Sequence, residues 1–150
     1  MKQTINLRVI ELVKKFEGLR LRAYTCPAGK LTIGYGHTGP EVCSGQQISI
    51  EQAEQLLSHD LSEAGAAVSE LVKVPLTENQ FSALVSFVFN CGTPAFAAST
   101  LLLSLNAGCY AAVPVQLKRW IHSRGTVIKG LVARRAAEAA LWAEPDERAR

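Results

Sequence analysis

The sequence predicts an α+β fold, in which an N-terminal helix and a small β lobe precede a bundle of helices. Apolar residues recur at helical spacing over residues 5–16, and again from residue 49 to residue 143. Between these stretches, residues 21–45 are rich in Gly, Thr, Tyr and Pro, which is typical of short strands and turns. No linker interrupts the 150 residues, so we expect one domain with a cleft between its β and helical parts.

Composition excludes several classes of protein. With 48% hydrophobic and 19% charged residues, the chain is too apolar for intrinsic disorder. It has no run of about eighteen apolar residues, so no membrane span is predicted. The net charge of +3 favours anionic surfaces such as a cell wall, but the basic residues form no stripe, and we expect no nucleic-acid partner. The charged N-terminal segment predicts a helix rather than a signal peptide, and hence folding in a cytoplasm.

Capping residues predict where the helices begin. Thr4 is expected to cap a first helix that ends at Gly18. Ser49 and Thr77 each stand three residues before a glutamine, which predicts two capping boxes, and Ser99 can cap a later helix. The remaining expected helices are Thr100–Ala107, Tyr110–Ile121 and Leu131–Ala143. A proline inside the second of these is expected to bend or shorten it.

The β lobe is predicted from two short runs, Arg22–Thr25 and Lys30–Tyr35, separated by a turn at Pro27–Gly29. This pattern favours a hairpin or a three-stranded sheet. Gly34 and Gly36 alternate with larger residues, so one face of the backbone is left open where a ligand can approach closely.

The four cysteines are far apart, at Cys26, Cys43, Cys91 and Cys109. They form no CxxC pair and no His/Cys cluster with the spacing of metal ligands, so we expect no metal and no cofactor. Cys91 and Cys109 lie in apolar helical segments and are expected to be buried, reduced thiols.

Glu17 is the first candidate for chemistry. It ends the first expected helix, where the negative pole of the helix disfavours a carboxylate and would raise its pKa. A glutamic acid that stays protonated near neutral pH is what a general acid requires. The basic residues on either side would act in the opposite direction if they were close in space, and a Glu at a helix end is more often simply solvated.

A longer pattern then identifies a family. Glu17, Cys26 and Thr32, separated by eight and five residues and followed by GYGHTG from residue 34, resemble the Glu–x8–(Asp or Cys)–x5–Thr signature of glycoside hydrolase family 24, the phage endolysins. Similar segments continue in the same order along nearly the whole chain, including FEGLRLRAYTCPAG, Arg119-Trp120 and the run Gly130-Leu131-x-x-Arg134-Arg135-x-x-Glu138. The resemblance implies one phage-type lysozyme domain over residues 1–150, with a lysozyme-like fold and an active-site cleft.

The resemblance also implies the reaction, cleavage of the β-1,4 bond between N-acetylmuramic acid and N-acetylglucosamine. Glu17 matches the residue that protonates the leaving oxygen, and Thr32 the one that helps to hold water. Cys26 stands where the best-studied branch has Asp. A thiol ionises near pH 8.5 and Asp near about 3.9, so Cys26 could act as base, nucleophile or electrostatic stabiliser only as a thiolate. Inverting hydrolysis, retaining hydrolysis and transglycosylation to a 1,6-anhydro sugar all stay open.

Further positions match the substrate cleft of the family. Thr38, Phe89 and Ser99 correspond to residues that line it, although Phe89 can equally be a core residue of an apolar helix. Arg135 is expected either to pair with Glu17 or to border the cleft.

His37 resembles a family histidine that pairs with an acidic residue in the following long helix, and Asp60 matches that partner. Buried His and Asp side chains are mostly paired for structural reasons. The pair is therefore expected to tie the β lobe to the helical bundle rather than to take part in catalysis.

The biological setting follows from the resemblance as well. It implies a monomer that accumulates in the cytoplasm of a host bacterium, passes through a holin and degrades peptidoglycan glycan strands in the periplasm, which lyses the host and releases phage. A lytic transglycosylase on the same scaffold and a catalytically inactive wall-binding domain are the alternatives.

Overall fold

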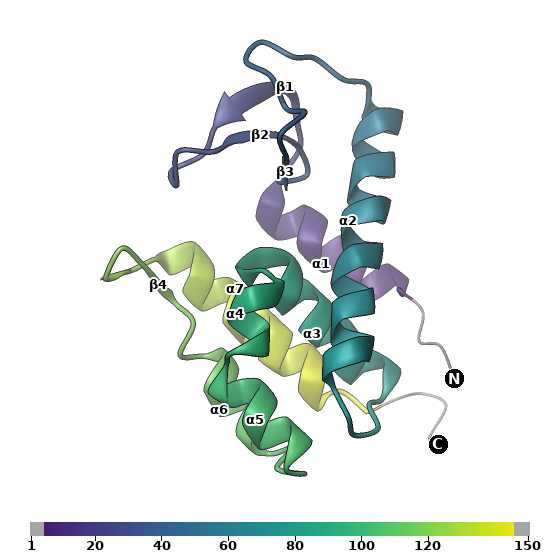
Figure 1. Ribbon diagram of the computed structural model, residues 1–150, viewed down its shortest axis with the longest axis vertical. Coiled ribbons are helices and arrows are strands. Elements are labelled where there is room, and N and C mark those ends of the chain that lie inside the picture. Colours follow the sequence, from purple (N-terminus) through teal and green to yellow (C-terminus); the bar gives the residue numbers. More distant parts are fainter. Residues whose placement is uncertain (1–4, 146–150) are drawn as a thin grey trace.

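The computed structural model describes residues 5–145 and confirms the predicted α+β class. A three-stranded sheet lies at one end of the molecule and a bundle of helices at the other, with α1 and the long α2 joining the two ends (Figure 1). The elements are α1 (Leu7–Glu17), β1 (Arg20–Thr25), β2 (Leu31–Gly34), β3 (His37–Thr38), α2 (Ile50–Leu71), α3 (Glu78–Cys91), α4 (Thr93–Ala97), α5 (Thr100–Asn106), α6 (Ala112–Leu117), β4 (His122–Ser123), β5 (Thr126–Val127) and α7 (Lys129–Ala143). None of the helices within residues 5–145 is both long enough and apolar enough to cross a bilayer.

Three of the four predicted capping residues begin helices. Ser49 and Thr77 form the predicted capping boxes at the starts of α2 and α3, and Ser99 caps α5. The first helix differs, because Asn6 is its N-cap and accepts a hydrogen bond from the Val9 amide at 3.1 Å. Asn is among the best capping residues, since its side-chain oxygen reaches the free amides of the first turn. The predicted cap, Thr4, lies outside the described residues.

The β lobe, residues 20–49, consists of the sheet and the loop that leads to α2. Its strands run antiparallel in the order β1-β2-β3. Thr32 of β2 pairs with Tyr24 of β1 and with Thr38 of β3, which places two of the candidate site residues side by side. The second strand ends at Gly34, one residue earlier than predicted, because Gly34 and Gly36 both adopt positive φ and turn the chain into β3.

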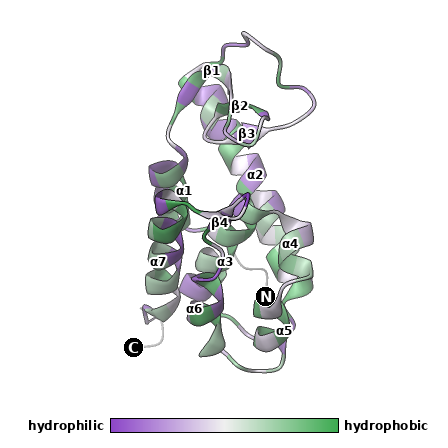
Figure 2. Cartoon of the chain, turned by 90° about the vertical axis from the view of Figure 1, so that its left-hand side faces the viewer, coloured by the Kyte–Doolittle hydropathy of each residue, from purple (hydrophilic) through white to green (hydrophobic). Residues whose placement is uncertain are grey.

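The hydrophobic core surrounds α3. This helix packs against α2 on one side and α7 on another, and most of its side chains are buried. Figure 2 shows the surrounding helices with hydrophobic and hydrophilic stretches mixed, as expected when only one face of each helix meets the core. Each buried aromatic or aliphatic side chain stabilises the fold by about 1.5–3 kcal/mol relative to exposure. The core therefore joins α2, α3 and α7 into one packed unit.

The segment after α5 differs from the prediction. A helix over Tyr110–Ile121 was expected, but α6 covers only Ala112–Leu117, with Pro114 in its first turn, where the missing amide has no helical acceptor to lose. The chain then forms the β4–β5 hairpin, whose turn residues Arg124 and Gly125 both have positive φ. The hairpin and the short α4 were not predicted.

The cysteines are free thiols, and one prediction about them is wrong. Cys91 is half-buried, near the expectation, whereas Cys109 is exposed. The reason is local: Cys109 follows Gly108 in the turn between α5 and α6, so it lies outside the helices whose apolar sequence suggested burial.

Candidate active site

Glu17 lies where α1 meets the β lobe. It is the last residue of α1, and Gly18 turns the chain from the helix towards β1. Its carboxyl group rests against the backbone of Gly36 in the β2–β3 turn, so closely that a Cβ on Gly36 would lie 2.8 Å from Glu17 Cδ. Gly36 also lines a hollow between the β lobe and the helices. A glycine at this position is therefore what admits the Glu17 carboxyl group to the edge of the cleft.

Arg134 of α7 is the ion-pair partner of Glu17. Its Nη1 lies 2.5 Å from Oε2 of Glu17, and its side chain is only 4% exposed against 20% for Glu17. The guanidinium also lies 5.9 Å from the centres of two aromatic rings, those of Phe16 and Phe89. This contact fixes the carboxyl group from the side opposite the β lobe.

Arg135 does not have the predicted role. It neither pairs with Glu17 nor borders the cleft, because it is fully buried. Its guanidinium donates to Asn90 Oδ1 at 2.7 Å and to Cys91 Sγ at 3.0 Å, at the end of α3. Consecutive residues on a helix point about 100° apart, so when Arg134 faces α1, Arg135 faces α3.

Cys26 follows β1, at the tight turn that leads to β2. Its amide donates to the Lys30 carbonyl at 2.9 Å, which closes this turn. A hydrogen bond from the Lys30 backbone lowers the pKa of the Cys26 thiol; contacts with the Thr32 hydroxyl and the Ala28 backbone act in the same direction and outweigh the effect of burial. Cys26 thus carries more thiolate at neutral pH than an ordinary cysteine.

Thr32 is the residue that links this turn to the cleft. It is buried, and its hydroxyl donates to the Lys30 carbonyl at 3.1 Å. Because Thr32 is also paired with Thr38 across the sheet, Thr32 links the turn that holds Cys26 to the strand that lines the hollow.

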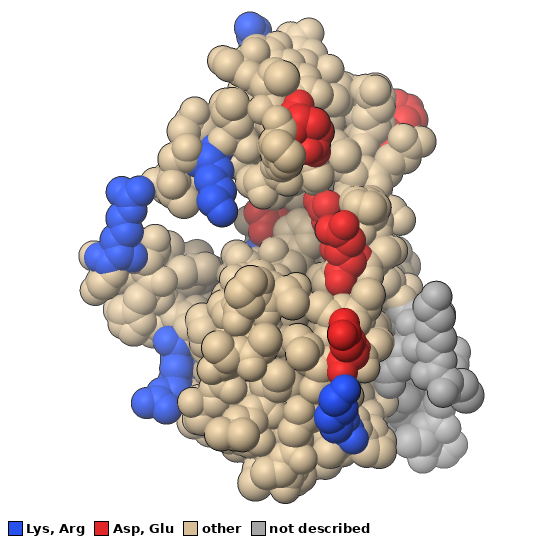
Figure 3. Space-filling model, viewed as in Figure 1, with Lys and Arg blue, Asp and Glu red and all other residues tan. Residues whose placement is uncertain are grey.

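A hollow of about 180 Å³ lies between the β lobe and the helices. Figure 3 shows this face indented between the upper and lower parts, with Asp and Glu side chains along the side on which α2 lies. The lining residues come from four elements and the turns beside them: Gly36, Thr38, Asp60, Glu63, Ala64, Val88, Phe89, Gly92 and Thr93. Two of the predicted substrate positions, Thr38 and Phe89, therefore lie at the same hollow.

Ser99 lies elsewhere. It lines a separate hollow of about 290 Å³ at the start of α5, together with other residues of the α4–α5 turn. Its hydroxyl donates to the Phe96 carbonyl at 2.6 Å and accepts from the Leu102 amide at 3.1 Å. The structure thus uses the Ser99 hydroxyl for capping and does not bring it to the hollow that Thr38 and Phe89 line.

His37 contacts two carboxylates rather than one. The expected contact with Asp60 is present, with Nδ1 at 2.7 Å from Oδ2, and Nε2 lies 2.5 Å from Oε1 of Glu41. Burial lowers the pKa of His37, but the two carboxylates outweigh it and leave that pKa raised. Burial raises the pKa of Asp60, whereas the His37 contact lowers that of exposed Glu41. Glu41 was not predicted, because its only signal in the sequence is an acidic residue four positions after the histidine.

Replacing His37 by Gln is expected to lower stability in a pH-dependent way. Because the pKa of His37 is raised in the folded state, its stabilising effect is complete below the unfolded value of about 6.5 and is lost as pH rises through the folded value. The melting temperature of His37→Gln should therefore fall furthest below the parent near pH 6 and approach it near pH 9. His122→Gln, at an exposed position on the β4–β5 hairpin, provides the matched control for the loss of a histidine side chain. A gap that stays constant with pH would contradict this account.

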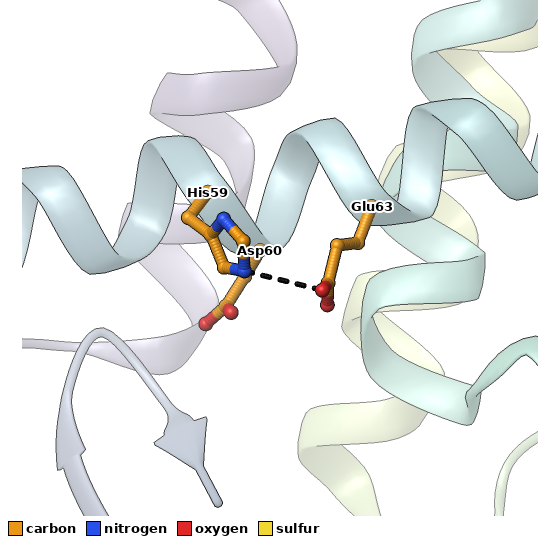
Figure 4. Close-up of side chains that lie close together, drawn as sticks. All are labelled: His59, Asp60 and Glu63. Atoms are coloured by element: carbon orange, nitrogen blue, oxygen red, sulfur yellow. Dashed lines mark ion pairs between the residues drawn. The ribbon is translucent and has the colours of Figure 1, made fainter.

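Next to Asp60, two exposed side chains of α2 form a further pair. His59 and Glu63, one helical turn apart, are 3.1 Å from each other, and Figure 4 shows both beside Asp60. The ligand atoms of His59, Asp60 and Glu63 all lie within 4.8 Å of one another, a spacing that a metal ion could bridge. Two ion pairs account for this arrangement, since Asp60 contacts His37 and Glu63 contacts His59. That the domain binds no metal stays a prediction.

Comparisons with known proteins give one consistent result. The family model described as phage lysozyme matches residues 14–138. The chain is 43% identical over 142 residues to an endolysin of Acyrthosiphon pisum secondary endosymbiont phage 1, covering 92% of this chain and 97% of that protein. It is 47% identical over 135 residues to an endolysin of Bacillus phage PZA, covering 89% of this chain but only 52% of that longer protein. Among solved structures, the muramidase domain of SpmX from Asticaccaulis excentricus matches with a TM-score of 0.87 and 40% identity, over 95% of this chain and 99% of that one.

Proposed function

Because this chain belongs to the phage lysozyme family and is a peptidoglycan-hydrolysing enzyme of the lysozyme type, we propose that Glu17, Cys26 and Thr32 carry out its reaction. The bond cleaved is the β-1,4 linkage between N-acetylmuramic acid and N-acetylglucosamine. One observation carries the proposal: the carboxyl group of Glu17 rests on Gly36, which itself lines the hollow between the β lobe and the helices.

In the first step, Glu17 protonates the glycosidic oxygen as the bond to the leaving sugar breaks. A glycan strand lying in the hollow would contact Thr38 on the β lobe and Phe89 on α3. Arg134 holds the Glu17 carboxyl group in one orientation, so the acid needs no rearrangement when the sugar arrives.

In the second step, Cys26 acts on the other side of the developing oxocarbenium ion. Its lowered pKa favours the thiolate, and a thiolate can stabilise positive charge, take a proton from water or attack the anomeric carbon. Thr32, in contact with this sulfur and bonded to the Lys30 carbonyl, keeps the thiolate and a nearby water in place.

The setting proposed for the enzyme is that of a phage lysis protein. Residues 1–150 form one lysozyme domain that acts as a monomer, stays in the host cytoplasm until a holin opens the membrane, and then degrades the wall. The related endolysins support the action on peptidoglycan.

Substituting Gly36 tests the geometry. In Gly36→Ala the new methyl group overlaps the Glu17 carboxyl group and must displace it, so kcat on purified peptidoglycan is expected to fall at least tenfold. Part of any effect on stability arises because φ is +72° at this position, which disfavours alanine.

Gly45→Ala is the matched control. Gly45 has a similar φ of +79° but nothing within 4 Å of a new Cβ, so it carries the same backbone cost without a clash. It should lower the melting temperature to a comparable degree and keep parental kcat. If Gly36→Ala were as active as Gly45→Ala, the contact between Glu17 and the β2–β3 turn would have no part in catalysis.

A further inference from the structure

A buried carboxylate stands behind the Glu17–Arg134 pair. Glu138 of α7 is fully buried, yet it is surrounded by polar groups. It accepts a hydrogen bond from the Ser86 hydroxyl of α3 at 2.6 Å, and its Oε1 lies 2.8 Å from Nε of Arg135. Its other oxygen, Oε2, lies 3.5 Å from Nε of Arg134. Arg134 thus contacts Glu138 through one edge of its guanidinium and Glu17 through another.

These four side chains form a continuous network from the core to the cleft: Glu138, Arg134, Arg135 and Glu17. Its charges balance, with two guanidinium groups against two carboxylates. Arginine keeps its proton at every working pH, and two buried guanidinium groups without a counter-charge would be strongly destabilising. Glu138 is fully buried, while Glu17 is the member that contacts Gly36 at the edge of the hollow.

The groups that face Glu138 come from three elements. On its own helix they are Arg134 and Arg135, α3 contributes Ser86 and the thiol of Cys91, and α1 contributes Glu17 beyond Arg134. Burial raises the pKa of Glu138. The two guanidinium groups and the Ser86 hydroxyl act on that pKa in the opposite direction.

We propose that Glu138, which does not reach the substrate, is a positioning residue: it orients Arg134 and offsets its charge, and so determines the pH range over which Glu17 keeps its proton. This inference rests on the proposed role of Glu17 as the general acid. The geometry behind it is that Nε of Arg134 lies 3.5 Å from Oε2 of Glu138, while Nη1 of the same guanidinium lies 2.5 Å from Oε2 of Glu17.

The sign of the effect follows from electrostatics. If Glu138 becomes neutral, the network gains one net positive charge close to Glu17. A positive potential favours the carboxylate form, so Glu17 loses its proton at a lower pH. Only the Arg134 guanidinium separates Glu138 from Glu17, so for a partly buried site the pH at which Glu17 loses its proton should change by about one unit. The alkaline limb of the kcat/KM profile, which reports the free general acid, should move down by that amount.

The experiment compares Glu138→Gln with Ser86→Ala on purified peptidoglycan from pH 4 to pH 9. Ser86→Ala removes a hydrogen bond to Glu138 but no charge, so it should lower the melting temperature and leave the alkaline limb in place. Glu138→Gln should lower the melting temperature and also move the limb down by about one pH unit. A limb that stays at the parental pH in Glu138→Gln would overturn the proposal and leave Glu138 a purely structural residue.

A second variant covers the case in which Glu138→Gln does not fold. Arg135→Gln removes a positive charge from the same network, so the alkaline limb of its kcat/KM profile should move to higher pH. A limb that stays at the parental pH in this variant would also overturn the proposal. The failure of the proposed function would look different. If the alkaline limb moves but Glu17→Gln stays active, Glu17 is not the general acid, although the network still influences the pH profile.

Discussion

Glu17→Gln is expected to reduce peptidoglycan hydrolysis by at least about a thousandfold, because an amide cannot donate the proton that the leaving oxygen needs. The substitution keeps the shape of the side chain and an oxygen that can still accept from Arg134. Substrate should therefore still bind, and the loss should appear in kcat rather than in KM. The measurement is the rate of reducing-end release from purified peptidoglycan under saturating conditions.

Glu11→Gln is the matched control for this variant. Glu11 lies on the same helix but is exposed, away from the hollow that Gly36 lines. Circular dichroism should show both variants folded at the assay temperature. Glu17→Gln is expected to melt lower, because Arg134 loses one of its two carboxylate partners. An active Glu17→Gln would contradict the assignment of the acid, and a loss of activity in Glu11→Gln would show that the assay reports helix stability instead.

Cys26→Ser is expected to lower kcat by about a hundredfold, and Cys26→Asp to keep kcat within about tenfold of the parent. A serine hydroxyl does not ionise in the working pH range, whereas Asp is a carboxylate above about pH 4. Since Asp ionises well below a thiol, the acid limb of the pH profile should lie at lower pH in Cys26→Asp than in the parent. Profiles of kcat/KM from pH 4 to pH 9 check both expectations.

Cys43→Ser controls for a general effect of losing a thiol, because Cys43 is exposed in the loop between the sheet and α2. It should match the parent at every pH. If Cys26→Ser were as active as Cys43→Ser, the thiolate would have no chemical role, and the second half of the reaction would have to be assigned to another group.

The sequence predicts the fold class and several helix starts for identifiable reasons. Capping boxes at Ser49 and Thr77 act through local hydrogen bonds, so three or four residues suffice to predict them. The helix expected over Tyr110–Ile121 failed for the opposite reason: its apolar residues are spaced as in a helix, and the turn at Arg124 and Gly125 that reverses the chain lies beyond it.

The network around Glu17 could not be predicted in the same way. Arg134 and Arg135 are adjacent, and the sequence does not give the rotation of α7 about its axis, which decides which of them meets Glu17. Glu41 was missed because the conformation of the loop after β3, which brings its carboxylate to His37, has no signature in the sequence. The Ser99 hydroxyl could serve a cap or a sugar, and only tertiary structure distinguishes these uses.

Mass spectrometry of the muropeptides that the parent and Glu17→Gln release from purified peptidoglycan tests the central claim most directly. The parent is expected to release disaccharide peptides with reducing N-acetylmuramic acid ends, and Glu17→Gln to release almost none in the same time. Anhydro ends from the parent would contradict hydrolysis, and equal release by Glu17→Gln would contradict the assignment of Glu17 as the acid.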